Sequence, residues 1–170
     1  RTLSVPLPRP DTSAAWFAST STVIPFRISS AGRVVYLQRN GSSVELWSTT
    51  RDGSSTPVPL NLPLPPGRSV FHFQFTVDEA EVVYASNQLD GMELFLVPAD
   101  GISLPRRISG PMVQNGSVQG SPSSYIASHN DLVLYLADQD TRFVTELYAT
   151  RLDRTHSPRR SDPPTDFVTR

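Results

Sequence analysis

Hydrophobic and polar positions alternate along this chain in short runs separated by turn residues, and the same arrangement occurs three times. Each copy holds a β-branched apolar run ending on tyrosine, followed by glutamate, leucine and an aromatic residue. The runs are Val34-Val35-Tyr36, Val82-Val83-Tyr84 and Val133-Leu134-Tyr135, and the later phrases are Glu45-Leu46-Trp47, Glu93-Leu94-Phe95 and Glu146-Leu147-Tyr148. Self-similarity at this period indicates a repeat protein.

The middle copy shows most clearly which elements a repeat predicts. Its alternating and apolar runs are typical of strands, and Asn, Asp and Gly at 87–91 and 100–101 are typical of tight turns. The strands predicted for this copy are 72–76, 81–86, 93–97 and 105–109, the last with a proline suited to a sheet edge. Four antiparallel strands in one repeat predict a propeller blade.

The other two copies follow the same order, so the chain is predicted to be all-β, a β-propeller with three four-stranded blades. The strands predicted for them are 23–29, 33–38, 45–50 and 56–60 in the first copy and 123–128, 131–138 and 145–152 in the third. The predicted segments are an N-terminal segment 1–22 carrying the outer strand of a preceding or partner blade, blades at 23–62, 63–113 and 114–154, and a polar tail at 155–170.

Composition excludes several classes of function. With 15 basic and 16 acidic residues the net charge is -1, which offers no electrostatic footprint for nucleic acid or an anionic membrane. No apolar stretch approaches the roughly 20 residues of a membrane-spanning helix, so no membrane insertion is expected. The 16 prolines disfavour long helices, and the absence of cysteine excludes disulfides and thiolate chemistry.

The order of strands and turns resembles the WD-like repeats of TolB-type β-propellers. The likeness covers 23–153 and rests on the whole pattern: the tyrosine run, a turn rich in Asn and Asp, the Glu-Leu-aromatic phrase, Asp-Gly and a basic outer strand. In that family the turn before the second strand usually contains Ser-Pro-Asp-Gly, and all three copies here depart from it. The resemblance implies a periplasmic or secreted bacterial protein that presents a ring face to protein or peptide partners.

Three blades leave two flat apolar faces uncovered, because propeller blades bury their faces against one another in a closed ring of four to eight. We therefore expect a homo-oligomer in which two chains close a six-bladed ring, or else a chain that is a fragment or unit of a larger assembly. Leu3 to Pro8 resembles Leu60 to Pro65, and Ser157 to Ser161 resembles Leu104 to Ser109. One terminal segment is thus predicted to complete a blade of a neighbouring chain.

No catalytic residue, cofactor site or metal site is predicted. His72, His129 and His156 stand alone without metal-ligand spacing, and no Gly-x-Ser-x-Gly elbow occurs. The repeated glutamate is expected to pair with an arginine or to accept hydrogen bonds from a turn. The aromatic residue that follows it is expected to pack between blades.

Loops that join the second and third strands share one end of a propeller with the linkers between blades, and loops commonly carry function. Their Asn and Asp side chains could offer oxygen ligands to a hard cation, but the same residues are what tight turns require, and that interpretation is favoured. The predicted contact residues on this face are Asn40, Asn87, Asp90, Gln114, Asn115, Gln119, Asp138 and Asp140.

Three functions fit the sequence. The favoured one is a non-catalytic scaffold that self-associates and binds a protein or peptide partner. The second is the propeller part of a larger hydrolase, similar to those of prolyl-oligopeptidase-like proteins. The third is a sugar-binding propeller.

Overall fold

The computed structural model describes residues 25–89, 91–120, 125–128, 131–153 and 159–160. Within these residues the fold is all-β, with twelve strands and no helix. The strands of the first sheet are β1 (Phe26–Ile28), β2 (Arg33–Asn40), β3 (Ser43–Thr50) and β4 (Val58–Pro59). Those of the second are β5 (Val70–Phe75), β6 (Glu81–Ser86), β7 (Glu93–Pro98) and β8 (Arg106–Arg107). Those of the third are β9 (Tyr125–Ser128), β10 (Leu132–Ala137), β11 (Glu146–Arg151) and β12 (Arg159–Arg160).

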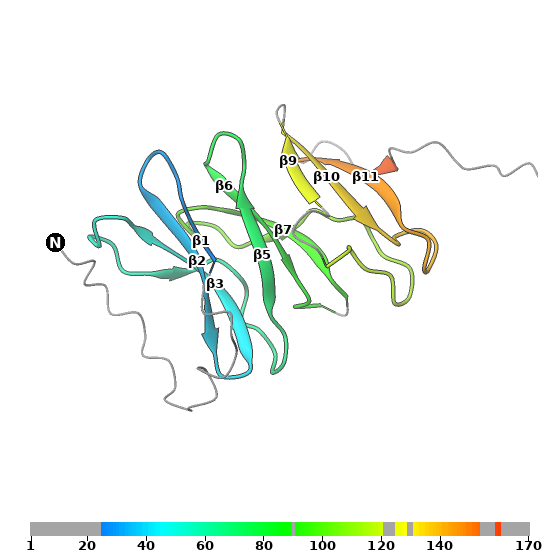
Figure 1. The fold of residues 1–170 in the computed structure, drawn as a ribbon, viewed down its shortest axis with the longest axis horizontal. Helices are drawn as coiled ribbons and strands as arrows, with labels where there is room; N and C mark the ends of the chain where they lie inside the picture. The colour runs from blue at the N-terminus through cyan, green and yellow to red at the C-terminus, as the bar shows by residue number, and fades with distance from the viewer. Residues whose placement is uncertain (1–24, 90, 121–124, 129–130, 154–158, 161–170) are drawn as a thin grey trace, which may run out of the picture.

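Each sheet is a four-stranded antiparallel meander in which neighbours in sequence are neighbours in space. The three sheets lie side by side in chain order, so that each presents one flat side to the next (Figure 1). The fold class predicted from the sequence, an all-β chain of four-stranded antiparallel blades, is confirmed in this form.

The second and third strands of each repeat fall where the sequence predicts them, and the outer strands are shorter. The outer strand of the third sheet, β12, pairs with β11 through Tyr148 and Ala149. It lies inside 155–170, for which the sequence predicts a polar tail. The segment 157–161, which contains β12, resembles the segment 104–109, which contains β8. The predicted outer strand within 1–22 lies outside the described residues.

A row of three aromatic side chains crosses the first three strands of every sheet. Strand register pairs the members within each row. The rows are Phe26, Tyr36 and Trp47 in the first sheet, Phe73, Tyr84 and Phe95 in the second, and Tyr125, Tyr135 and Tyr148 in the third. Tyr84 stacks on Phe95 and Tyr135 on Tyr148, with ring centroids 5.3 and 5.5 Å apart.

The second and third rows pack against aliphatic side chains of the preceding sheet, because side chains alternate between the two faces of a strand. One core joins the second row to Val35, Leu37 and Leu46 of the first sheet. The other joins the third row to Val83, Ala85, Leu94 and Leu96 of the second sheet. The prediction that the phrase aromatics pack between blades is confirmed for Phe95 and Tyr148.

At the two ends of the described array, one aromatic sheet face and one aliphatic sheet face have no sheet covering them. The aromatic end face carries the first row together with Ile28, and Phe26 there is 55% exposed. The aliphatic end face consists of Leu134, Leu136, Leu147 and Ala149 of the third sheet. By register, these four residues are equivalent to Val83, Ala85, Leu94 and Leu96, which are at most 1% exposed, whereas Leu136 and Leu147 are 37% and 36% exposed.

Candidate functional site

The hairpin loops β2–β3, β6–β7 and β10–β11 lie at one end of the sheets together with the linkers 61–69 and 110–118. We call this end the loop face. Hydrogen bonds between loops and linkers establish the grouping: Val44 donates to the linker residue Ser69, and Met92 donates to the linker residue Ser117. The loop face predicted from propeller topology is therefore present in the structure.

One serine in each linker fastens that linker to the sheets on both sides of it. The Ser69 hydroxyl accepts from the Val44 N–H at 3.0 Å, while the Ser69 N–H donates to Asn87 Oδ1 at 2.7 Å. Ser117 repeats the arrangement, accepting from the Met92 N–H at 3.2 Å and donating its own N–H to Asp138 Oδ1 at 2.6 Å. Because the acceptors belong to the following sheet and the donors to the preceding one, each serine ties two sheets together.

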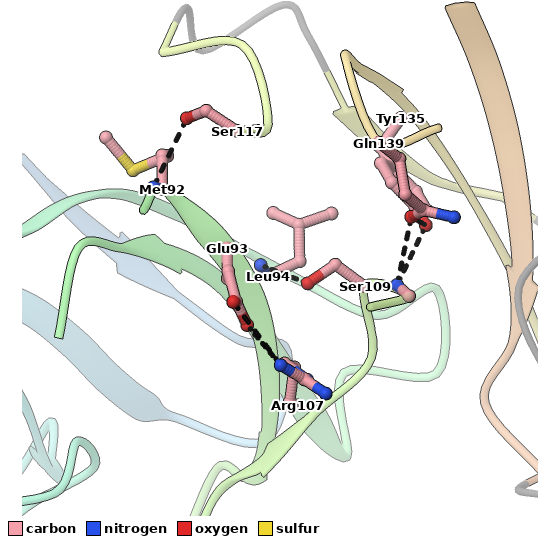
Figure 2. Close-up of polar contacts among 9 residues, drawn as sticks. Met92, Glu93, Leu94, Arg107, Ser109, Ser117, Tyr135 and Gln139 are labelled. Atoms are coloured by element: carbon pink, nitrogen blue, oxygen red, sulfur yellow. Dashed lines mark hydrogen bonds and ion pairs between the residues drawn. The ribbon is translucent and has the colours of Figure 1, made fainter. Parts of the chain in front are cut away.

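Further bonds hold the linker after the second sheet (Figure 2). The Leu94 N–H donates to Ser109 Oγ at 3.2 Å, as the Leu46 N–H donates to Asn61 Oδ1 in the sheet before. The Gly110 N–H points to both Tyr135 Oη and Gln139 Oε1, each at 3.1 Å. A Cβ at Gly110 would lie 2.6 Å from the Gln139 amide, so only glycine fits here without displacing that side chain.

The contact residues predicted from the sequence fall into two groups. Asn87 and Asp138 direct their oxygens at linker N–H groups, so they organise the loop face from within. Asn40 donates to Glu45 Oε1 at 3.3 Å, and Gln119 donates to Thr145 Oγ1 at 3.2 Å. The exposed members are Asn40, Gln114, Asn115 and Asp140, and Asp90 lies outside the described residues. A contact role for the exposed members stays a prediction.

Sequence reasoning missed the apolar side chains of the loop face. Leu62 and Leu89 are exposed in the linker 61–69 and in the β6–β7 loop, and Phe143 and Val144 are exposed in the β10–β11 loop. Asn, Asp and Gly mark loops in a sequence, whereas a leucine in a sequence gives no sign of its exposure.

The repeated glutamate pairs with an arginine, as the sequence predicts, in the second sheet. Glu93 is buried, and both of its carboxylate oxygens lie 3.3 Å from Arg107 Nη1, as Figure 2 shows. Glu146 accepts from the Tyr148 hydroxyl at 3.0 Å, and Glu45 accepts from the Trp47 indole N–H at 3.2 Å. In the second sheet the residue therefore serves as a buried ion-pair partner, and in the other two it anchors the neighbouring aromatic ring.

His72 is the histidine that the described residues place beside a core. His72 stacks on Tyr125 with ring centroids 4.9 Å apart, and burial lowers the pKa of His72. Across the described ranges no group of three His, Cys, Asp or Glu side chains could hold a metal ion. His129 and His156 lie outside the described residues. No helix in the described part of the chain is long and apolar enough to cross a membrane.

All five tyrosines have raised pKa values, and burial is the main cause for each. Burial raises the pKa of Tyr135 from 10.0 to about 12. A group whose pKa is higher in the folded state contributes stability that is complete below its unfolded pKa and disappears as pH rises through its folded pKa. We therefore expect constant stability from this source below pH 10 and a cooperative loss of fold from there to about pH 12.

Tyrosinate absorbance and far-UV circular dichroism followed together through an alkaline titration test this expectation. Absorbance should rise late and in step with loss of the β signal. Ordinary titration of several tyrosines near pH 10 with the β signal intact would contradict it.

Comparison with known proteins identifies the class of fold to which the structure is similar. No protein-family model matches the chain, and no curated protein matches it. A puromycin hydrolase mutant, solved as a complex, is similar with a TM-score of 0.58 and 13% identity over 83% of this chain and 22% of that chain. A putative TolB from Agrobacterium tumefaciens is similar with a TM-score of 0.50 and 17% identity over 82% of this chain and 50% of that chain.

These likenesses define the class of the protein as a propeller-like fold built of four-stranded antiparallel sheets. The expectation of a propeller fold from the sequence is confirmed at that level. This chain spans half the length of the TolB structure and a smaller share of the hydrolase.

Proposed function

We propose that this chain is a non-catalytic propeller module, that two copies close a six-bladed ring, and that the ring presents its loop face to a protein or peptide partner. One observation carries the proposal. Positions that are completely buried in the second sheet, such as Leu94, are exposed at their equivalents on the aliphatic end face, such as Leu147. An apolar sheet face of this kind is stable in water when another blade covers it.

The two end faces are complementary because one is aromatic and the other aliphatic, as in the contacts between sheets within the chain. Within the chain, an aromatic row always packs on aliphatic side chains of the preceding sheet. In a ring of two copies, the aromatic end face of each copy would meet the aliphatic end face of the other. The Tyr36 hydroxyl, on the aromatic end face, is buried without a hydrogen-bond partner among the described residues, whereas Tyr84 and Tyr135 each donate to a glutamine.

The ring size is consistent with two copies. Three four-stranded sheets from each copy give a ring of six. Six blades lie within the range of four to eight that closed propellers use.

Size-exclusion chromatography with light scattering tests the ring. We expect a species of twice 18.7 kDa that persists on dilution. A mass of one chain at micromolar concentration would overturn self-association, and a larger mass would overturn a ring of two.

A second candidate is the propeller part of a larger hydrolase. The likeness to the puromycin hydrolase, of which this chain covers 22%, favours it. Under this alternative, further blades of the same polypeptide cover the end faces. The open reading frame decides between the two, because a hydrolase part requires continuation into a hydrolase domain.

A further inference from the structure

The β10–β11 loop departs from the repeat. Tyr36 to Glu45 and Tyr84 to Glu93 span the same number of positions, whereas Tyr135 to Glu146 spans two more. Insertions that break a repeat commonly map to its binding face, because packing between units has no need of them. The longer loop lies on the loop face.

Phe143 in this loop is held in a conformation that its side chain disfavours. Its φ is +64°, in the left-handed region that a bulky residue rarely adopts, and its side chain is 79% exposed. The fold maintains this backbone through Asp138, whose Oδ2 accepts from the Phe143 N–H at 3.2 Å while Oδ1 holds Ser117. Such an outlier, supported by a buried carboxylate, points to function because packing gains nothing from an exposed ring.

Arg142 adds a charge to the exposed ring. Its guanidinium carbon lies 4.3 Å from the centroid of the Phe143 ring, and no ion pair joins it to another described residue, including Asp140 in the same loop. A guanidinium that stacks through its flat face still has N–H edges that suit a carboxylate. Val144, the next residue in the loop, is also apolar and exposed.

Building on the loop-face role proposed above, we propose that Arg142 and Phe143 form the anchor that binds the partner, and that the partner is a protein segment with an apolar side chain beside a carboxylate. Phe143 packs against the apolar side chain, and Arg142 pairs with the carboxylate. Aromatic and arginine residues dominate such anchors because they bury much area with few torsions to fix.

Selection from a random dodecapeptide library displayed on phage tests the proposal, with the immobilised wild-type chain as bait. We expect enriched peptides to carry Asp or Glu next to a large apolar residue. Phe143→Gly should weaken their binding about thirtyfold or more, the loss typical of an aromatic anchor. Arg142→Gln should weaken it about tenfold and remove most of its salt dependence.

Two controls separate the anchor from folding. Glycine relieves the positive φ, so Phe143→Gly should unfold at the same temperature as the wild-type chain or a higher one. Ile102→Ser, at a residue that is 83% exposed in the turn at the opposite end of the sheets, should leave peptide binding unchanged.

Four outcomes would overturn the anchor: no enriched sequence, peptides without the acidic and apolar pair, equal binding by Phe143→Gly, or a clear loss of thermal stability in that variant. Light scattering of Phe143→Gly keeps the two proposals apart. An unchanged assembled mass leaves the ring standing whatever the peptides do, and a mass reduced to one chain would assign Phe143 to the contact between copies.

Discussion

Leu136→Glu is expected to convert the assembled protein to single chains. Leu136 lies on the aliphatic end face and is equivalent to Ala85, which is fully buried against the third sheet. In the proposed ring the substitution places an unpaired carboxylate in an apolar contact, at a cost of at least about 2 kcal/mol, the mutational value for an uncharged polar group. A ring of two copies contains this contact twice, so the dissociation constant should rise about a thousandfold.

Light scattering over a dilution series measures that change, and Leu104→Glu is its matched control. Leu104 is a leucine exposed in the β7–β8 turn, away from both end faces, so its variant should keep the wild-type mass. Both variants should retain the thermal stability of the single chain, since neither replaced side chain belongs to a core. An assembled mass that survives Leu136→Glu would contradict closure through the aliphatic end face.

The arrangement of strands could be predicted from the sequence because packing between blades imposes a strong pattern. Tyr84 and Phe95 lie on one face of the sheet, and Val83 and Leu94 lie on the other. That alternation recurs in the same register in each copy, so the central strands could be placed almost to the residue. The outer strand β12 could not, since two paired residues in a polar, proline-containing stretch carry almost no periodicity.

The candidate site was less predictable because its geometry depends on contacts that are distant in sequence. Asn87 and Asp138 were recognised as loop residues, but their sequence positions do not show whether an oxygen faces solvent or the N–H of Ser69 or Ser117. The exposure and left-handed backbone of Phe143 follow from that same fastening of the loop. The only sequence signal for it was the two-residue difference in repeat spacing.

Asp138 does more than form a turn. It binds both the linker residue Ser117 and Phe143 of the proposed anchor. It is 8% exposed, and its two oxygens accept from two backbone N–H groups in different segments, Ser117 and Phe143. At the equivalent position in the second sheet, the Asn87 side chain accepts from the linker residue Ser69 and not from the described residues of its own loop. A carboxylate suits this position because its second oxygen can also bind the longer β10–β11 loop.

Asp138→Ala is expected to lower the free energy of unfolding by about 3 kcal/mol, because two charge-assisted bonds are lost and two backbone N–H groups are left without their acceptor. Asp138→Asn keeps one carbonyl oxygen for Ser117, as Asn87 does for Ser69, and should cost about 1 kcal/mol. Urea denaturation at constant m-value measures both, with Asp140→Ala as the control. Asp140 is exposed in the same loop, so its replacement should stay within about 0.5 kcal/mol of the wild-type chain. Equal losses for Asp138→Ala and Asp140→Ala would show that the two bonds contribute nothing beyond an ordinary turn residue.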